Sequence, residues 1–476
     1  MKLDTEACFH ALRTKDKRFD GMFYVAVSTT GIYCRPVCSA KAPLRTNCTF
    51  FAHAAAAERA GYRPCLRCRP ELAPGNSQVD STSRIATKAA SRIEDGALVD
   101  RSLGDLAAEI GVTDRHLRRV LEHEYGVSPI ELAQTHRLLL AKRLLTDTRL
   151  SMTEVAYASG FSSLRRFNAL FKQRYRLNPT EIRRTGGRSG AREALVCELG
   201  FAAPLDWESL LGFLNARLYR GVESIIEDRY RRTVKIGPHR GWLEAFPSGE
   251  KQAITVRMSA SLAPVFRDVV ARVKRLFDLS ARPDAIAETL GELAEASPGL
   301  RVPGAFDGYE IGIRAILGQQ VSVKGASTLA ARFAAAFGAP IETPFEELTH
   351  LTPTPQAVLE CADEQITALG ITSARARAIK ALSGAVACGD ILMEPGPNIE
   401  ETMKRLIQLP GIGEWTVQYL SMRTLGWPDA FPHTDLGIVK ALGETDGSKI
   451  LEIAELWRPW RSYAAMHLWK RLEKMN

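Results

Sequence analysis

The chain has 476 residues, of which 45% are hydrophobic and 25% are charged, so it carries enough apolar side chain for three or four folded domains. This composition excludes a disordered or fibrous protein, and no apolar run approaches the roughly 18 residues that span a bilayer, so we expect no membrane partner. The net charge of +9 is uneven: residues 1–190 hold 31 Lys and Arg against 19 Asp and Glu, and the remainder holds 32 against 35. A basic half favours a polyanionic partner over a merely solvated surface.

Four cysteines near the N-terminus form a Cys-x3-Cys and a Cys-x2-Cys pair: Cys34, Cys38, Cys65 and Cys68. This spacing is typical of a tetrahedral zinc site, and disulfides are the alternative. Residues 1–6 show no charged-then-apolar leader. We therefore expect a reducing cytoplasm, in which the zinc site is favoured.

Residues 29–38 (TTGIYCRPVC) and 61–68 (GYRPCLRC) resemble the zinc domain of the bacterial adaptive-response (Ada) proteins. The resemblance covers about the first 75 residues. It implies that Cys34 accepts a methyl group from a methylphosphotriester in DNA, and that DNA is contacted by Thr30, Ser39, Lys41 and Arg63. Zinc keeps sulfur deprotonated at neutral pH, and the cation of Arg35 would raise the thiolate fraction further. A purely structural Cys34 is the alternative.

Methylation of one thiolate would change the formal charge of the zinc site from minus two to minus one. Four thiolates on one dication repel phosphate, and loss of one negative charge weakens that repulsion. We therefore expect methylation to tighten DNA binding.

Two polar segments, residues 70–77 and 185–190, are predicted linkers, and residues 83–184 between them read as almost entirely helical. Two helix–turn–helix units follow one another, at residues 103–119 and 152–172. They resemble the DNA-binding domain of AraC-type regulators, whose two recognition helices enter successive major-groove segments. The candidate DNA contacts are Arg115, His116, Arg118, Arg119, Ser162, Ser163, Arg165 and Arg166. Solvated helix faces are the alternative for individual residues.

From about residue 192 the pattern changes to short strands, including residues 233–236 and 253–258. They predict an antiparallel sheet with helices on one face, in an α+β unit that ends near residue 300. This segment alone indicates no function.

The C-terminal part contains a Gly-Ile-Gly hairpin between two predicted helices, at residues 407–419. A hairpin of this kind exposes backbone N–H groups to a phosphate at the start of a helix. Together with residues 314–322, 431–437 and 457–463, it resembles the helix-hairpin-helix DNA glycosylases of the 3-methyladenine glycosylase II (AlkA) branch, over roughly residues 195–476.

This second resemblance implies that Asp435 is the catalytic carboxylate, which a helix N-cap role also suits. It implies phosphate contacts at Gly411 and Gly413, a wedge at Gln320 that fills the gap left by the flipped base, and a base pocket walled by Trp415, Tyr419 and Trp469. Aromatic walls would attract cationic alkylated bases by stacking and cation–π contact. Aromatic residues in the core are the alternative. The glycosylase step requires no metal or redox cofactor.

The predicted fold is multidomain α+β. It comprises a small zinc-bound α/β module (1–76), an all-α double helix–turn–helix domain (83–186), an α+β antiparallel-sheet domain (192–304) and an all-α helix-hairpin-helix glycosylase domain (305–476).

The predicted function is hydrolytic excision of alkylated bases of the 3-methyladenine type through Asp435, fused to a transcription regulator that senses methylphosphotriesters through Cys34. The alternatives are a regulator whose glycosylase half only binds DNA, and a glycosylase whose basic half only raises DNA affinity. The expected cofactor is Zn2+ and the expected partners are double-stranded DNA, at alkylated sites and promoters, and RNA polymerase. We expect a monomer in the bacterial cytoplasm, associated with the nucleoid.

Overall fold

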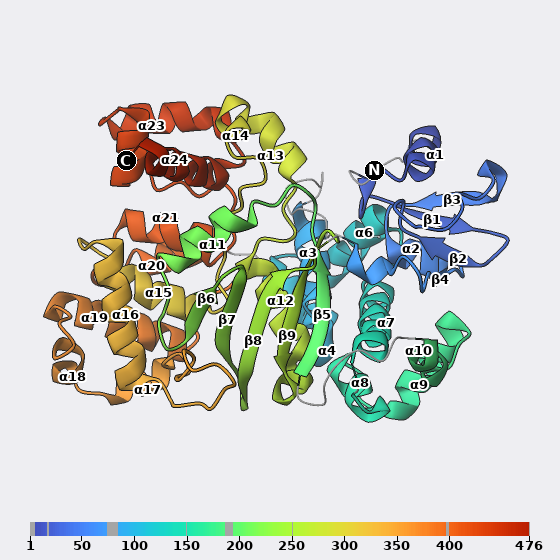
Figure 1. Cartoon of the computed structure of the whole chain (residues 1–476), viewed down its shortest axis with the longest axis horizontal. Helices are drawn as coiled ribbons and strands as arrows, with labels where there is room; N and C mark the ends of the chain where they lie inside the picture. Colours follow the sequence, from blue (N-terminus) through green and yellow to red (C-terminus); the bar gives the residue numbers. More distant parts are fainter. Residues whose placement is uncertain are drawn as a thin grey trace. The chain divides into compact units, whose positions relative to one another are not determined.

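The computed structural model describes residues 5–16, 19–73, 84–148, 150–185, 194–249, 251–396 and 399–475 (Figure 1). Residues 74–77 of the first predicted linker and 186–190 of the second, together with the predicted domain boundaries at 76, 83, 186 and 192, lie outside the described residues. The chain divides into two compact units. One holds residues 1–202, 248–271 and 279–281, and the other holds residues 203–247, 272–278 and 282–476.

The N-terminal module is a four-stranded sheet in the order β3-β1-β2-β4 with two helices. Its elements are α1 (Thr5–Thr14), β1 (Tyr24–Val27), β2 (Ile32–Cys34), β3 (Cys48–Phe51), α2 (Ala54–Arg59) and β4 (Arg63–Pro64). Gly31, at φ +66°, allows the tight turn between β1 and β2. The pairing places Val25 opposite Cys34, so the sheet fixes the position of the first cysteine.

Eight helices follow, and they confirm the predicted pair of helix–turn–helix units. They are α3 (Arg84–Glu94), α4 (Ala97–Asp100), α5 (Leu103–Ile110), α6 (Asp114–Tyr125), α7 (Pro129–Asp147), α8 (Met152–Ala158), α9 (Leu164–Tyr175) and α10 (Pro179–Thr185). Thr113 caps α6 and Ser163 caps α9, and each side chain accepts a hydrogen bond from the backbone N–H of the third residue of its helix. The turns before these helices contain Gly111 and Gly160 with positive φ.

The predicted antiparallel sheet is present, with strand order β5-β9-β8-β7-β6. The strands are β5 (Ala194–Gly200), β6 (Glu223–Ile226), β7 (Arg229–Ile236), β8 (His239–Pro247) and β9 (Ala253–Ser259). Strand β5 alternates buried and half-buried residues along its length, as a strand with one covered face requires. The accompanying helices are α11 (Trp207–Asn215), α12 (Phe266–Leu276), α13 (Pro283–Leu290) and α14 (Glu292–Glu295).

The C-terminal region is helical, as predicted. Its helices are α15 (Gly308–Leu317), α16 (Val323–Phe337), α17 (Pro355–Glu360), α18 (Asp363–Thr367), α19 (Ser373–Ala387), α20 (Ile399–Leu406), α21 (Glu414–Arg423), α22 (Leu436–Leu442), α23 (Gly447–Ala454) and α24 (Arg461–Met475). Helix α15 is buried on all sides and forms the centre of this region. The hairpin between α20 and α21 and the start of α22 carry the predicted site residues.

Among the described helices, none combines the length and the apolar character that crossing a membrane requires.

Candidate functional site

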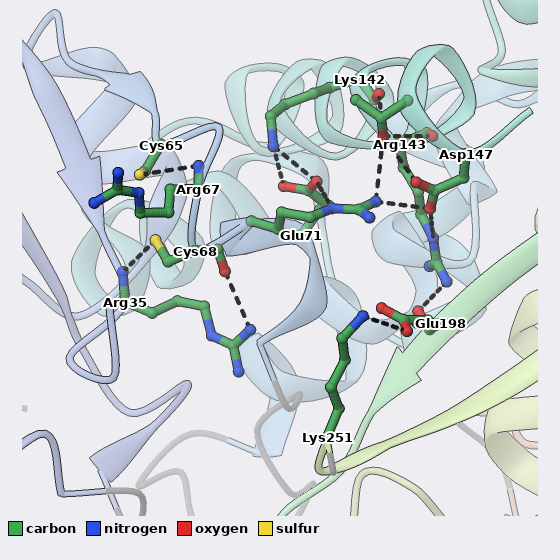
Figure 2. A network of polar contacts seen from close by, with 12 residues as sticks. Arg35, Cys65, Arg67, Cys68, Glu71, Lys142, Arg143, Asp147, Glu198 and Lys251 are labelled. Carbon is green, nitrogen blue, oxygen red and sulfur yellow. Dashed lines mark hydrogen bonds and ion pairs between the residues drawn. The ribbon is translucent and has the colours of Figure 1, made fainter. Parts of the chain in front are cut away.

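The four predicted zinc cysteines form one cluster. Their Sγ atoms all lie within 4.8 Å of one another. A tetrahedral zinc ion with Zn–S bonds of about 2.3 Å holds its sulfurs about 3.8 Å apart, so this donor set fits zinc. Figure 2 shows two backbone N–H groups that donate to the cluster: Arg35 N to Cys68 Sγ at 3.3 Å and Arg67 N to Cys65 Sγ at 3.4 Å. The zinc prediction is confirmed, and all four cysteines are free of disulfides.

The cysteines differ in accessibility. Cys38 and Cys65 are buried, whereas Cys34, at the end of β2, and Cys68 are both half-buried, so accessibility leaves two candidates. A sulfur that takes a group from DNA must be reachable from outside, and Cys34 meets this requirement.

Arg35 differs from its predicted role as a free cation beside Cys34. Its Nε donates to Asp20 Oδ1 at 2.8 Å and its Nη1 donates to the carbonyl of Cys68 at 3.3 Å (Figure 2 shows the second contact). Asp20 offsets the charge of the guanidinium and so reduces its effect on the thiolate, while the contact with the Cys68 carbonyl joins Arg35 to the second cysteine pair. Arg35 and Asp20 are 15 residues apart, so no local sequence pattern predicts this pair.

The predicted DNA contacts of this module lie around the cluster. Thr30, Ser39 and Lys41 are exposed, and Arg63 is half-buried opposite Ile32 on β2. Arg67 is a further exposed cation between the last two cysteines, which the prediction did not include. Its position inside the Cys-x2-Cys motif could have identified it from the sequence as a candidate DNA contact.

A buried ionic network extends from the zinc module to α7 (Figure 2). Lys142 Nζ binds both carboxylate oxygens of Glu71, at 2.6 and 2.7 Å, and Arg69 binds Glu71 and Asp147. Burial alone would raise the pKa of Glu71, but Lys142 and Arg69 lower it below its usual value. Figure 2 also shows Arg143 donating to the carbonyl of Glu198 in β5.

A second buried carboxylate joins the same elements. Glu58, in α2, accepts hydrogen bonds from the hydroxyls of Tyr33 at 3.0 Å, Tyr175 at 3.1 Å and Thr135 at 3.1 Å. Burial raises the pKa of Glu58 to about 7. Tyr33 directly precedes Cys34, and Tyr175 ends the second recognition helix, α9. One carboxylate therefore connects β2, which carries Cys34, with α9.

The predicted contacts of the recognition helices have different local environments. Arg115 and Arg165 are exposed, as are Arg119, Ser162 and Arg166, whereas His116 is half-buried. Arg118 Nε donates to Asp114 at 2.7 Å, one helical turn away. The Ser163 hydroxyl accepts from Arg166 N at 3.2 Å and caps α9, so it has a structural role whether or not it contacts DNA.

Asp435 lies at the N-terminus of α22. Its Oδ1 accepts from Gly437 N at 2.8 Å and Ile438 N at 3.2 Å. Two indoles complete the arrangement: Trp469 Nε1 donates to Oδ1 at 2.8 Å and Trp415 Nε1 donates to Oδ2 at 2.9 Å. Four N–H donors on the two carboxylate oxygens fix the orientation of this side chain. The two predicted pocket tryptophans thus also bind the predicted catalytic group.

The aromatic rings near Asp435 form a contiguous group. Trp415 and Tyr419 stack with centroids 5.2 Å apart and planes 11° apart, and Tyr419 lies 6.5 Å from Trp469. Rings at 5.2 Å are in direct contact, so no base fits between Trp415 and Tyr419. The free surface of the half-exposed Trp415 remains available for stacking.

Phe213 is a fourth ring that the sequence analysis missed. It stacks on Trp469 with centroids 6.2 Å apart and planes 20° apart. It lies on α11, about 200 residues before the other rings, on a helix whose buried face resembles ordinary core. No local pattern distinguishes it, because tertiary folding alone brings it to the site.

The predicted wedge and hairpin lie side by side. Gln320 is exposed between α15 and α16 with φ +54°, a backbone conformation that non-glycine residues rarely adopt. The neighbouring Gln319 Nε2 donates to the carbonyl of Gly411 at 2.8 Å. Gly411 has φ +78°, and Gly413 caps α21 without a side-chain acceptor, so the first N–H groups of α21 are open to a phosphate.

Comparison with known proteins covers all these parts. Four family models match: "Metal binding domain of Ada" at residues 7–71, "Helix-turn-helix domain" at 106–185, "AlkA N-terminal domain" at 196–307 and "HhH-GPD superfamily base excision DNA repair protein" at 313–461. Among solved structures, the 3-methyladenine DNA glycosylase from Archaeoglobus fulgidus shares the fold, with a TM-score of 0.52, 21% identity and coverage of 59% of this chain and 99% of that one.

Two relatives bear on the family. DNA-3-methyladenine glycosylase 2 of Escherichia coli is 38% identical, over 57% of this chain and 95% of the relative. The probable bifunctional transcriptional activator/DNA repair enzyme AlkA of Mycobacterium tuberculosis is 37% identical, over 99% of this chain and 97% of the relative. The chain belongs to the family of bifunctional transcriptional activator/DNA repair enzymes AlkA.

Proposed function

We propose that Asp435 and Cys34 carry the two activities of this DNA repair enzyme and transcription regulator. Asp435 supports hydrolytic excision of alkylated bases of the 3-methyladenine type, and Cys34 accepts a methyl group from a DNA phosphotriester. The observation that carries the first role is a carboxylate oriented by two indole N–H groups and two backbone N–H groups.

In the excision reaction, the bond between C1′ of the sugar and the base nitrogen breaks, and its electron pair stays with the base. Positive charge develops on the sugar, where the Asp435 carboxylate stabilises it. Water then adds to C1′ and loses a proton. The flipped base stacks on the aromatic group, Gln320 enters the space that it leaves, and the α20–α21 hairpin binds a phosphate of the same strand.

In the acceptor reaction, the Cys34 sulfur attacks the methyl carbon of the phosphotriester. The carbon–oxygen bond breaks and its electron pair returns to the phosphate, which becomes an ordinary diester. Cys34, Cys38, Cys65 and Cys68 would hold the zinc ion, which when bound would keep the Cys34 sulfur deprotonated at neutral pH. The reaction consumes Cys34 once, which suits a sensor better than a turnover enzyme.

Double-stranded DNA is the partner of both halves, and the recognition helices α6 and α9 supply its promoter contacts in this proposal. We also propose that the protein binds RNA polymerase and that it acts as a monomer. Its proposed location is the nucleoid of the bacterial cytoplasm.

Release of free base from methylated duplex DNA tests the enzymatic role. We expect the Asp435→Asn variant to lose release while the wild-type chain performs it. Asp446→Asn is a matched control, because Asp446 caps α23 by the same hydrogen bond but contacts no indole. Release by neither the wild type nor the variants would favour a regulator whose glycosylase half only binds DNA.

A further inference from the structure

Three arginines converge on Tyr419 in the glycosylase centre. The buried Arg423 donates from Nη1 to the Tyr419 hydroxyl at 2.7 Å, and its guanidinium carbon lies 4.9 Å from the Phe213 ring centroid. Arg217 covers the Phe213 ring at 3.7 Å, and its Nη1 donates to the carbonyl of Phe213 in its own chain segment at 3.2 Å. Arg314 is 8% exposed and donates to Ser327 at 3.2 Å.

Carboxylates act on these arginines only from beyond ion-pair distance, as Glu473 does on Arg217 and Glu223 on Arg314. In the described part of the chain, none of the three guanidinium groups lies within ion-pair distance of a carboxylate, and Arg314 Nη1 has no hydrogen-bond partner. Other buried arginines of this unit are paired, such as Arg232 with Glu310 at 2.7 Å and Arg461 with Asp429 at 2.7 Å. Arg423 also donates to the carbonyls of Pro303 and Gly304, and Arg217 is half-exposed, so hydrogen bonds and solvent offset part of the cost of these charges. Neither contact neutralises a cation, so a cluster of guanidinium groups beside a reaction centre favours a negative charge that appears there.

The phenol of Tyr419 responds to this charge. Burial alone would raise the pKa of Tyr419, yet that pKa is lowered because the three guanidinium groups outweigh burial. Burial raises the pKa of Tyr219, Tyr230 and Tyr463 in the same unit well above the usual value. The space next to Tyr419 is therefore electropositive.

The arginines also change what the aromatic walls can attract. A guanidinium already lies over Phe213, and another lies 5.6 Å from the Tyr419 ring centroid. A ring that already faces one cation attracts a second cation less strongly. The attraction of cationic bases to Tyr419, which is one of the predicted pocket walls, is therefore weakened, and Phe213 adds little to it.

We propose that Arg217, Arg314 and Arg423 form a charge selector that stabilises negative charge on the departing base. The proposal rests on the proposed site around Asp435. When the bond from C1′ breaks, the electron pair stays on the base: a base that is neutral in DNA leaves as an anion and then takes up a proton, whereas a cationic base leaves neutral. Only the first case develops the charge that the selector stabilises. Arg217 is the specificity-determining member, because it is half-exposed and bonded only within its own segment.

The test uses the full-length protein and compares its release of two bases that differ in charge. Duplex oligonucleotides carry either one hypoxanthine, which is neutral, or one 7-methylguanine, which is cationic, and base release is followed in single-turnover reactions at one pH. Arg217→Met removes the charge and keeps an unbranched side chain over Phe213, while Arg217→Lys keeps the charge. Thermal unfolding of each variant verifies the fold.

We expect Arg217→Met to lower hypoxanthine release on the order of 10-fold relative to 7-methylguanine release, and Arg217→Lys to keep most of it. Arg332→Met is the matched control, because Arg332 also donates to a backbone carbonyl and lies on α16. It should leave the ratio of the two rates unchanged. An equal loss with both bases, or a larger loss with 7-methylguanine, would overturn the selector.

A Tyr419→Phe variant excludes the other possible negative charge, a phenolate at Tyr419. Tyr419 is a predicted pocket wall and a partner of Arg423, so both release rates are expected to fall, but the selector predicts that hypoxanthine release does not rise relative to 7-methylguanine release. A wild-type preference for 7-methylguanine that Tyr419→Phe abolishes would contradict the proposal. Failure of the wild type to release either base would refute the proposed enzymatic function itself, which is a different result from an unchanged ratio.

Discussion

The zinc cluster and the Asp435 centre are built in different ways. All four ligands of the zinc cluster fall within residues 34–68 on two short loops. The Asp435 centre takes side chains from α11, α21, α22 and α24, across residues 213–469. A local motif can therefore define the first site completely, whereas the second is complete only after tertiary folding.

The two sites also stabilise their anionic groups differently. The zinc cluster combines thiolates with a dication and two backbone N–H donors. Asp435 receives only N–H dipoles, while the cations of its centre lie behind the aromatic rings. In the proposed mechanism this difference matters, because a carboxylate that is held by N–H groups and has no ion pair among the described residues would keep its charge available to the sugar.

Removal of zinc should separate the two sites most sharply. Structural zinc in small modules contributes roughly 10 kcal/mol or more of folding free energy, so chelation or a Cys38→Ser change should unfold the N-terminal module. Base release from methylated DNA should continue at a similar rate. Metal analysis, circular dichroism and base release on the same samples measure this. Loss of base release together with zinc would show that the two centres depend on one another.

Loss of Glu71 should have the next largest effect. Glu71→Gln leaves Lys142, which is 1% exposed, as a buried cation with a weakened partner. Breaking a buried pair in this way costs about 3–5 kcal/mol, measured as the free energy of unfolding in denaturant. Glu401→Gln removes an exposed pair with Arg405 and should cost under about 0.5 kcal/mol.

Glu58 should make the unfolding free energy of the unit that contains the zinc module depend on pH. Its pKa is raised to about 7 in the folded chain from a usual value of 4.5, so the folded state retains this proton longer than the unfolded state. The stabilisation is fully present below pH 4.5, falls as pH rises towards 7, and amounts to about 3 kcal/mol over that window. Glu58→Gln should flatten this part of a plot of unfolding free energy against pH. If Glu58→Gln left the slope of this plot unchanged, a group other than Glu58 would cause the pH dependence.

The indole N–H groups should have the smallest effect of these changes. Trp415→Phe and Trp469→Phe keep an aromatic ring but remove one donor to Asp435, and each should slow base release about 10- to 100-fold. Trp207→Phe removes an indole that donates to the carbonyl of Asp228 and should not slow release. Equal rates for all three variants would mean that the indoles do not orient the carboxylate.

Local features of the molecule were predictable from the sequence. The Leu436–Leu442 helix capped by Asp435 and the zinc cysteines follow from short patterns, and the structure contains both. Phe213, the Arg35–Asp20 pair and the three arginines around Tyr419 were not predicted. Each depends on residues far apart in the chain, where no periodicity or spacing constrains which side chains meet.

The most direct test treats methylated duplex DNA with the wild-type chain and with Asp435→Asn, and measures two products from each reaction. Chromatography gives the released base, and mass spectrometry gives the methylation state of the peptide that contains Cys34. We expect the wild type to release base and to gain one methyl group on Cys34, and Asp435→Asn to keep the methylation while it loses the release. Two results would contradict the assignment of the two activities to these two residues: base release by Asp435→Asn at the wild-type level, or methylation of a cysteine other than Cys34.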